Sequence, residues 1–183
     1  MAPASPSALP ALAALPSLAD LERRAAGGGL LLRLQVSDRL GIRGLRVVVA
    51  RSRPQQPPLL LGELKGWALP TTAGLQLDTM RVQGQDIATV GPLIWAATGA
   101  WALECTPCRQ ARLLAIRDDP RQHRRLVRYF ERLGFTPLRD LGAGPLDLAL
   151  RLVWGGTGLL MRGELVEVLR RSVRRLEWIA PGP

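Results

Sequence analysis

The chain has 183 residues, 47% of them hydrophobic, which is enough for one domain with its own core. Its formal net charge is +10, and Lys65 is the only lysine among 25 basic residues. A GC-rich genome would explain the bias toward arginine, while the excess charge also fits a surface that binds nucleic acid, phosphates or an acidic protein. No apolar run is long enough to span a bilayer, so we expect no transmembrane segment.

The N-terminal region divides into a tail and a short helix. Residues 1–16 are rich in alanine and proline and carry no charge, and their prolines interrupt the apolar segment that a secretory signal needs. We predict a flexible tail there. Ser17 and Asp20 have the spacing of a capping box, which predicts a helix from Ser17 to about Ala26, ended by three glycines.

Four β-strands are expected next, over residues 30–36, 45–52, 59–69 and 75–82. Turns over 38–44, 54–58 and 70–74 are short enough to make an antiparallel meander. Gly62 and Gly66 predict bulges or kinks in the third strand. The fourth strand alternates cleanly, which predicts one face with Leu75, Leu77, Thr79 and Arg81 and another with Gln76, Asp78, Met80 and Val82.

An apolar helix over residues 91–104 follows, and because it is apolar on nearly every side we expect it in the core. Cys105 and Cys108 come directly after it, separated by two residues. Such a pair can be half a zinc site or a redox motif. His123 is the only histidine, so a closed Cys/His zinc site lacks ligands, and a redox pair would precede a helix. We predict two reduced thiols, no metal, and a reducing, cytoplasmic compartment.

Residues 111–135 read as strand, tight turn, amphipathic helix, glycine stop and strand. Asp118 or Asp119 can cap the helix, Pro120 suits its first position, and Gly134 suits its C-terminal end. Leu126, Val127, Phe130 and Leu133 share one face of this helix, and five arginines occupy the rest.

The C-terminal part predicts two strands, over 136–141 and 146–154, and a flexible glycine-rich turn over 155–158. A last helix over 164–179 carries an apolar stripe with Leu165, Leu169, Val173 and Leu176, and arginines elsewhere. Such a helix packs on its own sheet, or it binds an anionic membrane, RNA or a partner groove.

The unit over 111–135 resembles the C-terminal part of the GNAT superfamily of acyl-CoA N-acyltransferases, whose helix often ends Tyr-x-x-x-Gly-Phe. Here Phe130, Gly134 and Phe135 fill that pattern, and His123 lies seven places before the motif's tyrosine position. The resemblance covers about residues 59–154. It implies an α/β (α+β) fold, a mixed and mainly antiparallel sheet flanked by helices, with an extra basic amphipathic helix at the C-terminus. We expect one domain over 17–162 and that helix over 163–180. The run over 111–156 is also similar to uncharacterised GNAT-like proteins of cyanobacteria and plastids.

The resemblance implies acetyl-CoA as the acyl donor, with its pyrophosphate at the loop that precedes the apolar helix. Two placements of that loop compete. Residues 81–86 keep a glycine but put Asp86 at the second glycine position, while residues 85–90 fit the helix start and have no glycine. The cofactor-binding candidates across both placements are Val82, Gln83, Gly84, Gln85, Ala88, Val90 and Gly91.

The family's catalytic tyrosine falls on Phe130, and Tyr129, the only tyrosine, comes one place earlier, about 100° around the helix. Glu63 and Asp78 are candidate bases, and His123 and Tyr129 are candidate acids, although each also fits as an ordinary surface residue. No helix fits between the first two strands, where the family usually builds part of its acceptor site.

Two functions therefore remain open. One is an N-acetyltransferase that moves an acetyl group from acetyl-CoA to an unknown amine. The other is a non-catalytic GNAT-fold module, a pseudoenzyme that binds an acidic protein partner or RNA through its arginines.

Overall fold

The computed structural model describes residues 15–84 and 87–177, so most of the predicted N-terminal tail lies outside the described residues. A seven-stranded sheet has the order β1-β2-β3-β4-β5-β7-β6. The pair β4–β5 is parallel, and the other neighbouring pairs are antiparallel. This is the mixed, mainly antiparallel sheet that we expected.

The N-terminal half is a helix followed by a four-stranded meander. Its elements are α2 (Leu18–Gly27), β1 (Leu30–Arg39), β2 (Ile42–Arg53), β3 (Gln56–Ala68) and β4 (Leu75–Val82). The capping box of Ser17 and Asp20 opens α2, as predicted. The first two turns are tighter than predicted, and Leu40 and Gly41 alone join β1 to β2, with φ of 53° and 80°. The expected absence of a helix between these strands is confirmed.

A bulge at Asp78 breaks the alternation predicted for β4. Lys65 of β3 pairs with Thr79, and the next residue, Gly66, pairs with Leu77, so Asp78 is the extra residue of β4. The bulge shifts the faces of the strand. Met80 and Val82 therefore pack against the same core as Leu75 and Leu77, and the clean period of two was wrong.

Helix α3 (Ile87–Cys105) is the centre of the core. It begins four residues before the predicted start and contains Pro92. It lies very close to β3, because a Cβ at Gly62 would come within 2.7 Å of Val90 Cγ1. It also lies close to the last helix, because a Cβ at Gly99 would come within 3.2 Å of Leu169 Cβ.

The C-terminal half contains β5 (Gln110–Ile116), α4 (Pro120–Leu133), β6 (Phe135–Leu141), a 3-10 turn (Pro145–Asp147), α5 (Leu148–Trp154), β7 (Gly158–Glu164) and α6 (Leu165–Glu177). One prediction was wrong here, and one strand was missed. The segment 146–154 is helical, because leucine, alanine and arginine favour helix over strand and Gly155 ends it in the left-handed conformation. The predicted turn over 155–158 is present, but β7 begins at its last residue, was not predicted, and lies between β5 and β6.

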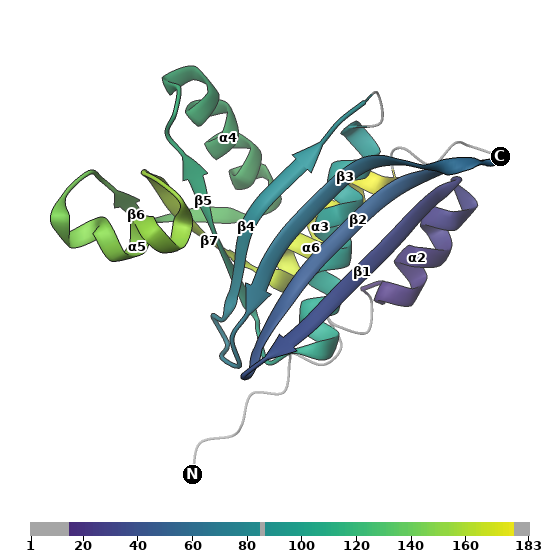
Figure 1. Ribbon diagram of the computed structural model, residues 1–183, viewed down its shortest axis with the longest axis horizontal. Helices are drawn as coiled ribbons and strands as arrows, with labels where there is room; N and C mark the ends of the chain where they lie inside the picture. The colour runs from purple at the N-terminus through teal and green to yellow at the C-terminus, as the bar shows by residue number, and fades with distance from the viewer. Residues whose placement is uncertain (1–14, 85–86, 178–183) are drawn as a thin grey trace, which may run out of the picture.

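Helices cover both faces of the sheet. Helices α2, α3 and α6 pack on one face, and α5 covers part of the other, where its Trp154 packs with Leu114, Leu141 and Leu160. Figure 1 shows β1–β4 as one curved layer with α2, α3 and α6 behind it, while α4 stands beyond the far edge of β4. The apolar stripe of α6 packs into the main core through Leu165, Val168, Leu169 and Val173. On that other face, the ring of Trp154 lies 6.3 Å from the ring of Trp67 of β3, and within the described ranges no helix crosses the front of β1 and β2. From β3 to β6 the elements follow the order that the resemblance implied, while α5 replaces the strand expected over 146–154.

Candidate functional site

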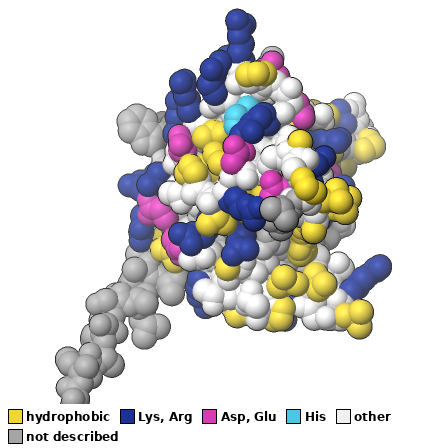
Figure 2. All heavy atoms as spheres, turned by 90° about the vertical axis from the view of Figure 1, so that its left-hand side faces the viewer, with side chains coloured by type: hydrophobic (Ala, Val, Ile, Leu, Met, Phe, Trp, Pro, Cys, Tyr) yellow, Lys and Arg dark blue, Asp and Glu magenta, His cyan; other side chains and the backbone are white. Residues whose placement is uncertain are grey.

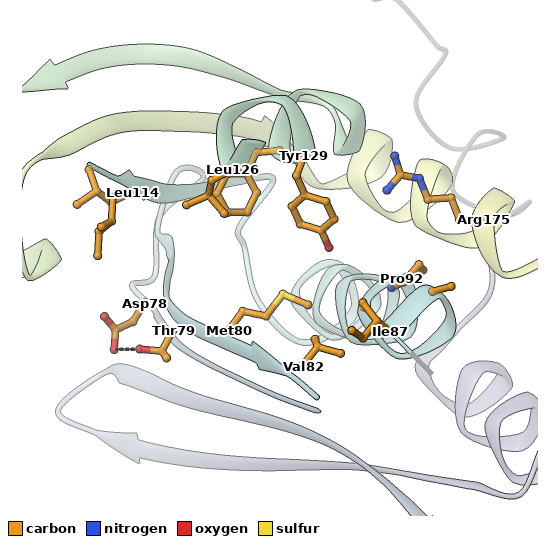
Figure 3. A pocket seen from close by; sticks show the side chains of 14 residues that line it. Asp78, Thr79, Met80, Val82, Ile87, Pro92, Leu114, Leu126, Tyr129 and Arg175 are labelled. Carbon is orange, nitrogen blue, oxygen red and sulfur yellow. Dashed lines mark hydrogen bonds between the residues drawn. The ribbon is translucent and has the colours of Figure 1, made fainter. Parts of the chain in front are cut away.

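A pocket opens where β4 and β5 separate. The two strands pair only over Leu75–Leu77 and Ala111–Leu113, and beyond the bulge at Asp78 no described strand continues the sheet between them. The pocket has a volume of ≈ 610 Å³. Its lining comes from β4, the first turns of α3, the end of β5, the middle of α4 and Arg175 of α6 (Figure 3).

Helix α4 supplies Leu126, Tyr129 and Phe130 to the pocket wall. Local sequence signals fix this helix. The Asp119 carboxylate accepts hydrogen bonds from the N–H groups of Arg121 and Gln122, at 2.9 and 2.8 Å. Gly134 ends the helix with a φ of 99°. These ends confirm the predicted unit and set which face of α4 meets the pocket.

Tyr129 points its hydroxyl into the pocket, towards the space between Met80 and Pro92 (Figure 3). Trp95 Nε1–H of α3 donates a hydrogen bond of 2.8 Å to the Tyr129 oxygen. Trp95 itself is fixed by edge-to-face contacts with Phe130 and Phe135, with ring centroids 6.0 and 5.6 Å apart. The phenol proton is not used in the bond from Trp95, so it remains available to a ligand.

Burial raises the pKa of Tyr129 above its ordinary value of 10.0. The hydrogen bond from Trp95 and the charge of Arg175 act in the opposite direction and are weaker. At neutral pH the phenol is therefore protonated. A protonated phenol in a partly dry pocket can donate a proton to a group that gains negative charge.

The start of α3 forms a second wall of the pocket, with Ile87, Ala88 and Gly91. The first N–H groups of a helix have no intrahelical acceptor, and the first turn of α3 carries no acidic side chain. The absence of a side chain at Gly91 leaves space for a ligand beside the Tyr129 hydroxyl. A Cβ at this position would already lie 3.4 Å from the Tyr129 oxygen, and a larger side chain would fill the space. This end of α3 can therefore hold an anionic group close to the pocket.

The structure separates the seven predicted cofactor-binding residues. Val82, Ala88 and Gly91 line the pocket. Gln83 donates its side-chain N–H to the Leu60 carbonyl of β3 at 2.9 Å, and Gly84 turns the chain with a φ of 87°. Val90 is fully buried in the core beside Gly62. Gln85 and Asp86 lie outside the described residues.

The four predicted catalytic residues do not converge on one point. Tyr129 and Asp78 both line the pocket, and Asp78 accepts a hydrogen bond of 3.1 Å from the Thr79 hydroxyl (Figure 3). Glu63 instead forms ion pairs with Arg46 and Lys65, at 3.1 and 3.0 Å. The hydrogen bond from Arg46, and then that from Lys65, hold the pKa of Glu63 below its ordinary value.

His123 is not part of the pocket lining. Its Nδ1 lies 3.0 Å from the Ile116 carbonyl at the end of β5. This contact ties the first turn of α4 to β5, so the position suits a structural role.

Sequence reasoning missed three residues of the site. Met80 was assigned to a face without regard to the bulge, although it lines the pocket. Trp95 was expected only as a core residue, yet it holds the Tyr129 hydroxyl. Arg175 was expected on a surface cluster of the last helix, and it reaches the pocket because α6 packs on α3. Of these three, only Trp95 carried a signal in the sequence. A buried indole N–H usually needs a hydrogen-bond acceptor, and Tyr129 supplies it here.

No cluster of acidic, histidine and cysteine side chains that could hold a metal is present within 15–84 and 87–177. Cys105 is exposed and Cys108 is buried, and both are free thiols, as predicted. The described helices include none that is long and apolar enough to cross a membrane.

No protein-family model matches the chain, and no curated protein sequence matches it. Several solved structures are similar, and two of them align as follows. The crystal structure of aminoglycoside 6'-acetyltransferase type Ii aligns with a TM-score of 0.45 and 15% identity, over 66% of this chain and 69% of that one. A structure of a KacTA–DNA complex aligns with a TM-score of 0.37 and 16% identity, over 75% of this chain and 76% of that one.

Proposed function

We propose that the protein transfers an acetyl group from acetyl-CoA to an amine in the pocket between β4 and β5. The observation that carries the proposal is the fork of the sheet with the Tyr129 hydroxyl inside it. A fork of this kind admits an extended ligand between two strands. The buried, protonated phenol then lies where a leaving group would need a proton.

The backbone of β4 supplies one side of the donor site. Thr79–Val82 pair with β3 on one edge, and no strand of the described chain pairs with their other edge. An amide-containing chain such as the pantetheine arm can hydrogen-bond to that edge as an added strand would. Ala88 and the first N–H groups of α3 lie where they could hold the phosphates.

Bound acetyl-CoA would supply an activated thioester. The amine nitrogen bonds to the acetyl carbon, the carbon–sulfur bond breaks, and the sulfur leaves with the electron pair of that bond. Tyr129 donates its proton to this sulfur, in the role that Phe130 cannot fill. Asp78 accepts the proton that the amine loses, through water, because its carboxylate lies on β4, across the pocket from Tyr129 (Figure 3).

The acceptor amine would approach from the face of β1 and β2 that carries no described helix (Figure 1). The two-residue turn between β1 and β2 leaves that approach open. A wide approach suits a large acceptor as well as a small one.

Calorimetric titration of acetyl-CoA into the full-length protein tests the donor site. We expect saturable binding by the wild type and its loss in Ala88→Phe, because the new ring would fill the mouth of the pocket. Ala26→Phe is the matched control, since Ala26 is also an exposed helical alanine and lies on α2, outside the pocket lining. Absence of binding up to millimolar acetyl-CoA, or equal binding by both variants, would refute the proposal.

A further inference from the structure

We propose that α4 carries a docking surface for double-stranded RNA, made by Arg121, Arg124, Arg125 and Arg128. These four residues, here called the α4 arginine stripe, recur at the helical spacing i, i+3, i+4 and i+7. All four are exposed, and together they line a shallow hollow of ≈ 370 Å³. Figure 2 shows basic side chains projecting at the end of the molecule that holds the single histidine, His123, which also lies on α4.

The α4 arginine stripe lacks the ion pairs that other arginines of this protein form. Within the described ranges none of its four guanidinium groups has a carboxylate partner. Arginines elsewhere do pair with acids, namely Arg23, Arg43, Arg46, Arg117, Arg139, Arg170 and Arg171. Four like charges at neighbouring helical positions repel one another, so this surface favours an anion that can meet several of them at once.

The opposite face of α4 excludes a membrane as the partner. Phe130 and Leu133 are buried in the core, and Leu126 packs against it. The apolar face therefore cannot insert into a membrane. The α4 arginine stripe can meet only a surface that lies across it. It extends about 10 Å along the helix axis, which is long enough to contact several successive phosphates.

The side chains around the stripe favour paired RNA over single strands and over DNA. Single-stranded nucleic acid binds by stacking on exposed aromatics. The aromatic residues of α4, Tyr129 and Phe130, instead face the pocket and the core. Gln122 is exposed between the arginines, and its amide can bond to a ribose 2′-hydroxyl, which DNA lacks. A-form RNA is recognised through its backbone and 2′-hydroxyls, which this surface can reach.

Fluorescence anisotropy with a labelled RNA duplex of about 16 base pairs tests the proposal. The full-length protein is compared with a variant in which all four stripe arginines become glutamine. Each lost phosphate contact should lower the slope of log K against log salt by about 0.9, so we expect a loss of about 3.6 and at least about a tenfold weaker binding near 0.1 M salt. Thermal unfolding checks that the variant is folded, and Arg124→Gln alone should give about a quarter of the change in slope.

The matched control removes the same charge elsewhere, by changing four exposed arginines on α2, β1 and α6 to glutamine: Arg24, Arg33, Arg39 and Arg174. We expect it to keep most of the salt slope. Equal weakening in both quadruple variants would show a general effect of net charge and overturn the proposal. Binding of an equally long DNA duplex as tightly as RNA, or of poly-glutamate in place of RNA, would also overturn it. Gln122→Ala should reduce the preference for RNA over DNA.

Discussion

Replacement of Tyr129 by phenylalanine separates the structural role of its hydroxyl from the chemical role proposed for it. In the folded protein, the hydroxyl oxygen accepts the hydrogen bond that the Trp95 indole N–H donates, at 2.8 Å, and Trp95 is 2% exposed. Tyr129→Phe therefore leaves a buried N–H without an acceptor. Such a group costs about 1–3 kcal/mol. For a chain of this length that corresponds to a melting temperature lower by about 2–12 °C.

A double-mutant cycle with Trp95→Phe isolates the hydrogen bond. Trp95→Phe removes the donor and also some packing, so its total cost exceeds that of the bond alone. The double variant lacks both partners and leaves no unpaired group. We expect a coupling energy of about 0.5–1.5 kcal/mol from urea unfolding of the four proteins. A coupling indistinguishable from zero would show that the bond does not hold Tyr129 in place.

The chemical role predicts a larger effect on turnover than on binding. Loss of a positioned proton donor lowers kcat by about 10²–10⁴-fold, while the Kd for acetyl-CoA should change little because the ring remains. Since burial raises the pKa of Tyr129 above 10.0, the donor stays protonated, and kcat should not fall between about pH 7 and 9. An acetyl-transfer assay against a panel of amines measures both. Full turnover in a destabilised Tyr129→Phe protein would assign the hydroxyl a structural role only.

Three further predictions concern the pocket and the helix ends. Gly91→Val should raise the Kd for acetyl-CoA in calorimetry more than it lowers the melting temperature, because a Cβ there already comes within 3.4 Å of the Tyr129 oxygen. Asp119→Ala should lower the free energy of unfolding in urea by about 1 kcal/mol, and Asp119→Asn by less, because asparagine also caps a helix. The hydrogen bonds from Ser17, and then Arg23, lower the pKa of Asp20 from 3.8 to about 2. Its stabilising contribution is therefore complete above pH 3.8 and is lost as pH falls through 2, and Asp20→Asn should flatten unfolding curves over that window.

Local signals predicted the elements that depend on neighbours in sequence. The capping box at Ser17, the cap at Asp119 and the stop at Gly134 each act within one helical turn, and the structure confirms all three. The strand prediction for residues 146–154 was wrong because leucine occurs at every second position there, which is the pattern of a strand. That prediction gave more weight to the alternation of the side chains than to the preference of leucine and alanine for helix, and the preference for helix was the better guide.

The pocket depends on features that one sequence does not reveal. The bulge at Asp78 exists only in the pairing of β4 with β3, and it sets which side chains of β4 reach the core. The fork exists because β4 and β5 pair over three residues only, while β5 pairs along its other edge with β7, a strand that was not predicted from the sequence. Both features are contacts between strands, so no short window of residues carries their signal.

Tyr129 lies one residue before the position of the motif's tyrosine, which is Phe130 in this chain. The pocket nevertheless contains a tyrosine hydroxyl. One place along a helix turns a side chain by about 100°, which suggested that Tyr129 would face away from the site of Phe130. In the structure both rings line the pocket, because α4 presents a broad face to it and Phe130 also reaches the Trp95 and Phe135 rings. Tyr129 then enters from the side, and the indole of Trp95 holds its oxygen. A hydroxyl can reach the pocket from more than one position of α4, provided that its side chain faces the pocket and a hydrogen bond such as that from Trp95 fixes it.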